Sequence, residues 1–171
     1  MKRCFVGKRL SESRILQIIL WVAVFEAVSA AIGYITRPEV DGWYAALVRP
    51  WFTPPNFVFP VMWTLLYALI AAAGFYIWSA RGGGGAAGKR RVYLFALYMA
   101  LNWSWSFIFF MGGQLLAGFI WIIAMNIVAV ALVVQCWHPL RRAAFLMLPP
   151  LAWTLFAAVL NGAFWWLNRG G

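Results

Sequence analysis

Five long apolar runs occupy most of the chain, and each is long enough to cross a bilayer as a helix. The first run, residues 15–36, would rise roughly 33 Å as an α-helix, which is enough to span the hydrocarbon core. The apolar stretches are too uninterrupted for the strands of a membrane β-barrel, which alternate over about ten residues. The sequence therefore predicts an all-α integral membrane protein, a five-transmembrane-helix bundle, whose other spans cover about 56–80, 92–112, 115–137 and 143–168.

The composition supports lipid as the solvent for most of this chain. Hydrophobic residues make up 65% and charged residues 11%, whereas a soluble domain carries about a quarter charged residues. The net charge of +10 could indicate nucleic acid as a partner. The basic residues, however, lie in short segments between apolar runs, which is a topology signal rather than a phosphate-binding face. We therefore expect membrane lipid and no nucleic acid.

The chain divides into a basic N-terminal extension, residues 1–14, and a single membrane domain, residues 15–171. We expect a long loop at 37–55 and a flexible basic loop from Gly82 to Arg91. Pro149 and Pro150 should fall in the first two turns of the last helix and kink or delay it. The first run could instead be a cleaved signal peptide, but Glu26 interrupts it and it stays apolar to Ile35, which favours a retained helix.

The distribution of Lys and Arg predicts the orientation. Eleven of them lie in the N-terminal segment and in the second and fourth connections, against three in the first connection and the C-terminal segment. The positive-inside rule then places the N-terminus in the cytoplasm and the C-terminus outside. We expect a multi-pass protein of a bacterial cell membrane.

Signatures of metal or nucleotide chemistry are missing from the sequence. One histidine and two cysteines cannot build a zinc site of ordinary composition, and neither a Walker loop nor a dinucleotide fingerprint is present. We expect no metal site and no obligatory cofactor.

Glu26 is the one acid inside an expected span. A carboxyl at such depth is costly and is a candidate functional residue, for example in a proton-coupled exporter of small molecules. It shares a helical face with Ser29, Ala30 and Gly33, so it should face protein rather than lipid. The alternative is a protonated or hydrogen-bonded packing residue at a helix interface.

Aromatic residues are the most prominent feature inside the runs: the chain has 12 Trp, 6 Tyr and 14 Phe. Interfacial belts explain many of them, but Trp63, Trp103, Trp105 and Trp153 lie deeper. Helical spacing aligns Trp63 with Tyr67 and Gly74, and Asn102 with Trp105 or Ser106 and Phe109. It also aligns Trp153 with Ala157, Asn161 and Phe164. Such faces suit a pocket for a planar, largely apolar ligand with Asn102 and Asn161 as polar anchors; ordinary core packing explains the pattern equally well.

Three ordered motifs resemble one family. WYAALVRPWFTPPNFVFPVMWTLLY at residues 43–67 is similar to the signature of the TspO/MBR family, the tryptophan-rich sensory proteins related to the mitochondrial translocator protein or peripheral benzodiazepine receptor. LNWSWSFIFF at 101–110 and PPLAWTLFAAVLN at 149–161 resemble its third and fifth helices. The resemblance covers roughly residues 20–168, and neither the extension 1–14 nor Glu26 belongs to these motifs.

The resemblance implies a five-helix membrane receptor or transporter, usually a homodimer. A cavity under the first loop would bind tetrapyrroles, such as porphyrin and haem, and benzodiazepine-site ligands. Trp63 and Trp153 match a pair implicated in light-dependent porphyrin breakdown, which leaves an enzyme as an alternative function. The cholesterol-recognition tyrosine of the animal proteins is replaced here by Gly162, so sterol binding gains no support. Carried over residue by residue, the expected cavity involves Tyr44, Pro54, Trp63, Tyr67, Asn102, Trp105, Trp153, Ala157 and Leu160.

Overall fold

The computed structural model describes residues 2–170, with side chains from residue 12 onward. Within this part, five helices are long and apolar enough to cross a membrane, which confirms the expected fold class. They are α1 (Lys2–Asp41), α2 (Val58–Ser79), α3 (Gly85–Ser106), α4 (Leu115–Cys136) and α5 (Arg141–Asn168). A short 3₁₀ turn, η1 (Tyr44–Ala46), lies in the first loop, and a π-helical turn, η2 (Phe107–Met111), continues α3.

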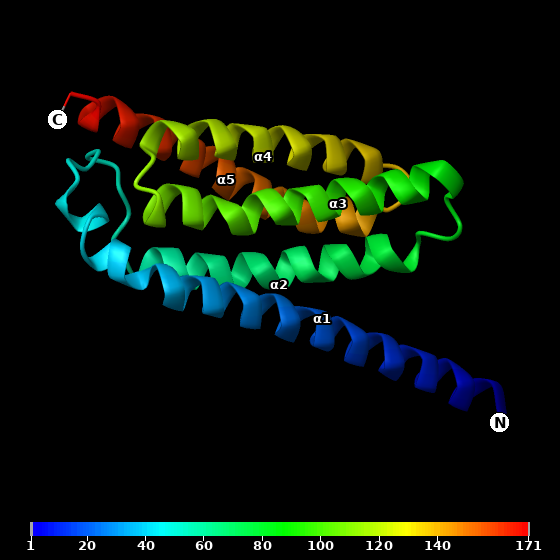
Figure 1. Ribbon diagram of the computed structural model, residues 1–171. Helices are drawn as coiled ribbons and strands as arrows, with labels where there is room; N and C mark the ends of the chain where they lie inside the picture. Colours follow the sequence, from blue (N-terminus) through cyan, green and yellow to red (C-terminus); the bar gives the residue numbers. More distant parts are fainter. Residues whose placement is uncertain (1, 171) are drawn as a thin grey trace.

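The helices run up and down, so the connections gather at two ends of the bundle (Figure 1). The α2–α3 and α4–α5 turns lie at the end that also holds the N-terminus. The loop 42–57, the α3–α4 turn and the C-terminus lie at the opposite end. This arrangement agrees with five spans, and the side of the membrane that each end faces stays a prediction.

Two expected boundaries are wrong. The first helix does not stop at residue 36 but continues through Pro38 to Asp41. Pro38 has no backbone N–H, so the helix lacks one hydrogen bond near its end. The Pro38 carbonyl accepts from the Gly42 N–H at 2.9 Å, which closes the last turn. The basic loop is also shorter than expected, because α3 begins at Gly85 and includes Lys89, Arg90 and Arg91. Lys and Arg are good helix formers, so basic side chains do not end a helix.

The prolines of the last helix do not delay it. Helix α5 begins at Arg141, so Pro149 and Pro150 lie more than two turns inside rather than in the first two. Each proline removes one backbone hydrogen bond, a loss that packed neighbours tolerate inside membranes. The Thr154 hydroxyl donates to the Pro150 carbonyl at 3.0 Å and to Asn126 Oδ1 at 2.7 Å, which joins α5 to α4.

The main core lies between α2, α3, α4 and α5. Small residues allow close approach there: Ala71, Ala73, Ala129, Ala143 and Ala144 are fully buried. A second apolar cluster lies at the loop end and is centred on Tyr44, Phe109, Leu160 and Phe164. The turn beneath it depends on Gly113, whose φ of +60° favours glycine.

Helix α1 lies at the outside of the bundle. In its described part, Phe25 and Thr36 are the buried residues. The helix approaches α2 closely at Gly74, where an added Cβ would lie 2.4 Å from the Phe95 ring and 2.8 Å from the Trp21 ring. Toward the loop end, α1 and the other four helices enclose a hollow.

Candidate functional site

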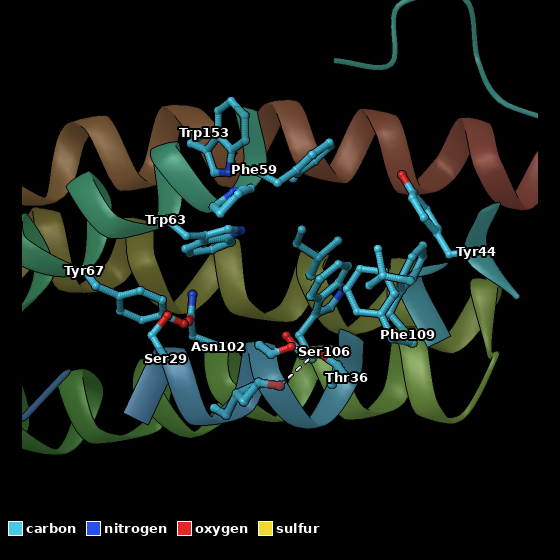
Figure 2. A pocket seen from close by; sticks show the side chains of 18 of the residues that line it. Ser29, Thr36, Tyr44, Phe59, Trp63, Tyr67, Asn102, Ser106, Phe109 and Trp153 are labelled. Atoms are coloured by element: carbon cyan, nitrogen blue, oxygen red, sulfur yellow. Dashed lines mark hydrogen bonds between the residues drawn. The ribbon is translucent and has the colours of Figure 1, made fainter. Parts of the chain in front are cut away.

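A cavity of about 440 Å³ occupies this hollow. Helices α1, α2, α3, α4 and α5 all line it, and the first loop contributes Tyr44 and Asn56. Figure 2 shows its side chains pointing inward from several helices. Small-molecule sites typically measure roughly 300–1,000 Å³, so the cavity has the size of a ligand site.

The structure brings together eight of the nine residues expected to form a cavity. Pro54 is the exception: it lies in the first loop, is half-buried and does not line the hollow. The eight that line the cavity are Tyr44, Trp63, Tyr67, Asn102, Trp105, Trp153, Ala157 and Leu160.

One wall consists of aromatic rings from α2 and α5. Phe59 lies one turn before Trp63 on α2, and its ring meets Trp153 edge to face at 6.1 Å between centroids. Trp63 tilts over Tyr67 at 5.3 Å. Figure 2 shows Trp153, Phe59, Trp63 and Tyr67 along the same side of the hollow. This wall offers flat apolar faces, which suit a planar ligand.

The loop end of the cavity is closed by a second aromatic group. Trp105 stacks on Phe109 with centroids 4.8 Å apart and planes 17° from parallel. The indole N–H of Trp105 donates to the Gly118 carbonyl at 3.1 Å, which fixes the ring to α4. Tyr44 meets Phe109 edge to face at 6.0 Å. The π-helical turn that holds Phe109 shifts the residues after Ser106 relative to an α-helical register.

Polar groups are few and mostly engaged. The Tyr67 hydroxyl donates to Asn102 Oδ1 at 2.5 Å, and the Asn102 amide donates to Met125 Sδ at 3.4 Å. Asn102 is therefore held by the protein rather than free to anchor a ligand. The Asn161 amide donates to the Ala157 carbonyl at 2.8 Å, while its buried Oδ1 accepts from no protein donor in the described part of the chain. Asn161 thus presents an open acceptor.

Helix α1 supplies the polar side of the hollow. Glu26, Ser29, Gly33 and Thr36 follow one another along the face that lines it, as the helical spacing predicts for the first three. One carboxyl oxygen of Glu26 is buried and meets no hydrogen-bond donor among the described residues. In Figure 2, Ser29 lies beside Tyr67 and Asn102. Glu26 therefore faces protein rather than lipid, next to the deep polar group of the cavity.

The first loop covers the cavity and is fastened to the end of α5. The Val48 amide donates to Asn168 Oδ1 at 2.9 Å, and Asn168 Nδ2 donates to the Val48 carbonyl at 3.0 Å. The Arg49 guanidinium lies 5.5 Å from the Tyr44 ring centre and donates to Asn56 Oδ1 at 3.3 Å. Burial raises the pKa of Tyr44 although Arg49 opposes the shift, so its phenol stays neutral at ordinary pH.

The sequence analysis missed Phe59, which lines the cavity four residues before Trp63 and shares its helical face. Phe109, which it aligned with Asn102 and Trp105, also lines the cavity. The spacing signal was therefore present. Spacing aligned Trp105 with Asn102, and both line the cavity. Trp103 lies off that face and packs on Phe25 at 5.5 Å between ring centroids.

Comparison with known proteins decides the family. The TspO/MBR family model matches residues 21–167, which includes the span of every cavity-lining residue. The chain belongs to the TspO/MBR family. Within the family, it is 36% identical over 154 residues to the Tryptophan-rich protein TspO of Archaeoglobus fulgidus, covering 90% of this chain and 98% of that protein.

Relatives extend beyond prokaryotes. The Translocator protein of Sus scrofa is 32% identical over 150 residues, which is 85% of this chain and 89% of that protein. Protein CrtK of Rhodobacter capsulatus is 31% identical over 148 residues, covering 84% of this chain and 88% of its own. In this TspO/MBR protein the three sequence motifs thus fold into the first loop with α2, the end of α3, and α5, which together build most of the cavity wall.

Proposed function

We propose that this protein is a membrane receptor or transporter that binds tetrapyrroles in the cavity beneath its first loop. The observation that carries the proposal is the aromatic wall of Phe59, Trp63 and Trp153 in a hollow of about 440 Å³. A flat macrocycle can stack on such rings, and aromatic contacts add about 0.5–1.5 kcal/mol each beyond burial of area. Benzodiazepine-site ligands, which are also flat and aromatic, would use the same wall.

The polar groups of the site fit a ligand that is apolar at its centre and acidic at its edge. The indole N–H groups of Trp63 and Trp153 have no acceptor within the described part of the chain, unlike those of Trp105 and Trp121. They are free to donate to a ligand. Arg49 lies at the loop beside two lining residues, Tyr44 and Asn56, and supplies a positive charge for a carboxylate.

A titration with protoporphyrin in darkness tests the proposal. Binding to purified protein in neutral detergent should saturate at one porphyrin per chain, with quenching of tryptophan fluorescence. Arg49→Gln should weaken protoporphyrin binding roughly two- to fivefold, the range of an exposed ion pair, and should leave its dimethyl ester unaffected. Arg169→Gln, at the same end but stacked 3.3 Å over Trp166, is the matched control. Uptake no greater than into empty micelles would contradict the proposal.

A second function, light-dependent porphyrin breakdown, is favoured by the position of Trp63 and Trp153 on one side of the same cavity (Figure 2). Indole is far easier to oxidise than phenyl. Illumination of the complex then distinguishes an enzyme, which destroys the porphyrin, from a receptor, which holds it unchanged.

A proton-coupled exporter is the third candidate, and the open carboxyl oxygen of Glu26 within the cavity favours it. Efflux of a small cation from cells or vesicles should then fail in Glu26→Gln, while porphyrin binding in the dark persists. Equal efflux in Glu26→Gln and the parent protein would remove this candidate.

A further inference from the structure

Arg91 is a buried cation that the cavity does not use. It lies two turns into α3, at the end of the bundle opposite the first loop, and its side chain is 7% exposed. Its Nε is buried and meets no acceptor in the part of the chain whose side chains are described. A buried N–H donor without an acceptor is destabilising, so an acceptor from outside the described chain is expected.

The chain itself offers no acid for this role near Arg91 in sequence. The four acids, Glu12, Glu26, Glu39 and Asp41, all belong to α1. Residues 42–170 contain eight Lys and Arg and no Asp or Glu. The ion pair found among the described side chains joins Arg37 to Asp41 at 3.5 Å, near the opposite end. Arg91 therefore has no carboxylate partner within the described structure.

The neighbouring arginines are satisfied in other ways. Arg81 lies 4.1 Å from the Trp78 ring centre and donates to the Trp78 carbonyl at 2.8 Å. Arg141 lies over the Phe145 ring at 5.6 Å. Lys89, Arg90 and Arg142 are exposed and can be hydrated. Among these basic side chains, Arg91 alone is both buried and unpaired.

The surroundings of the Arg91 guanidinium add positive potential rather than cancel it. An added Cβ on Gly84 would lie 2.6 Å from Arg91 Nη2, so the guanidinium sits beside the residue that caps the N-terminus of α3. The first N–H groups of a helix have no intrahelical acceptor and carry a partial positive charge. A guanidinium and a helix N-terminus that face one another without an acid form an arrangement that binds anions.

The position along the bundle indicates which anion. Arg91 lies in the second turn of α3, beside the α2–α3 turn at one end of the bundle (Figure 1). It therefore lies near the level where a spanning helix begins, which is close to the depth of lipid phosphates. We propose that Arg91 and the N-terminus of α3 bind a phosphate group, supplied either by the headgroup of an anionic lipid or by free phosphate. This site is separate from the tetrapyrrole cavity and does not depend on it.

Lipid titration tests the site in the whole protein. Protein in neutral detergent is titrated with phosphatidylglycerol, with phosphatidylcholine or with inorganic phosphate, and lipid adducts and the thermal midpoint are measured. The parent protein should bind phosphatidylglycerol in preference to phosphatidylcholine and be stabilised by it. Arg91→Gln should weaken this binding about tenfold or more, as expected for loss of a charged hydrogen bond. Arg90→Gln removes the same charge from an exposed neighbour and should change it less than about twofold.

The arms of this experiment separate the sources. If phosphatidylglycerol stabilises the protein and millimolar phosphate does not, the bound group is a lipid headgroup. If inorganic phosphate stabilises it equally, the bound group is a free anion. In either case the stabilisation should be lost in Arg91→Gln. Equal losses in Arg91→Gln and Arg90→Gln would overturn the site and leave only general attraction to negative lipid. If Arg91→Gln does not fold, the parent protein still decides, because the absence of any preference for phosphatidylglycerol or phosphate would overturn the proposal.

Discussion

The hydroxyl of Tyr67 on α2 donates to Asn102 Oδ1 on α3 at 2.5 Å, and both residues line the cavity. The bond joins the two helices at a depth where water is scarce. It also orients the Asn102 amide toward Met125 on α4. One side-chain pair therefore positions three of the helices that surround the cavity.

Tyr67→Phe should lower the stability of the bundle. The substitution leaves the buried Asn102 oxygen without its donor, and we expect a loss of about 1 kcal/mol in the free energy of unfolding. Denaturant unfolding in detergent measures it. Tyr93→Phe removes the same hydroxyl from an exposed position on α3 and should change stability by less than about 0.5 kcal/mol. Equal effects would show that the Tyr67 bond contributes little.

The tryptophan pair should affect photochemistry more than binding. Trp63→Phe and Trp153→Phe each keep an aromatic ring, so each should retain most of the dark affinity for porphyrin. If the protein breaks porphyrin down in light, both variants should lose most of that rate, because phenyl is much harder to oxidise than indole. Affinity, thermal midpoint and photobleaching rate are measured in parallel. Photobleaching at the parent rate in both variants would leave a binding protein, and joint loss of stability and binding would assign both rings to packing.

The orientation of the bundle is testable with a fusion. One end of the bundle holds the N-terminus, the α2–α3 turn before the basic start of α3, and the α4–α5 turn before Arg141 (Figure 1). The C-terminus lies at the other end. The excess of Lys and Arg at the first end predicts that it is cytoplasmic. A periplasmic alkaline phosphatase fused after Gly171 should be active, and a fluorescent protein that matures in the cytoplasm should not. The reverse pattern would invert the topology.

A homodimer remains a prediction, and α3 offers a surface for it. Ala96 and Ala100 are exposed, so they do not pack against a helix of the same chain. Ser104 lies one turn further and donates to the Ala100 carbonyl at 2.6 Å. Small residues at spacing four let helices approach closely in lipid. Ala100→Leu should reduce cross-linked dimer in detergent without unfolding the monomer, and Ala152→Leu on the outer face of α5 should not.

The sequence predicts the spans well because a bilayer leaves few alternatives. Twenty apolar residues in lipid must satisfy their backbone within the segment, so each run becomes a helix. The ends are harder to place, as α3 shows. Its second turn carries Lys89, Arg90 and Arg91, which suit both a helix at the interface and a loop. Only the packed structure reveals that one of them is buried.

The cavity was predictable as a set of faces but not as a volume. Spacing placed Trp153, Ala157 and Asn161 on one side of α5, and all three line the hollow. Gly74, which spacing aligned with Trp63, instead lies against Phe95 and Trp21. A small residue can either leave room for a ligand or let a neighbouring ring pack against its helix. Long-range packing decides between the two, and sequence periodicity carries no information about it.

Ala157 provides the most direct test of the tetrapyrrole site. It lines the cavity one turn after Trp153, and a larger side chain there would occupy the space of a flat ligand. Overpacking of this kind costs about 1–3 kcal/mol, or roughly one to two decades in affinity. The control is Ala152→Thr, which makes the same change on the exposed face of α5.

Protoporphyrin affinity of Ala157→Thr and Ala152→Thr, measured in darkness beside the parent protein, is therefore the deciding measurement. The account predicts that Ala157→Thr binds about ten- to a hundredfold more weakly, with unchanged helicity, while Ala152→Thr binds as the parent does. Parent-like affinity in Ala157→Thr would contradict a tetrapyrrole site in this cavity.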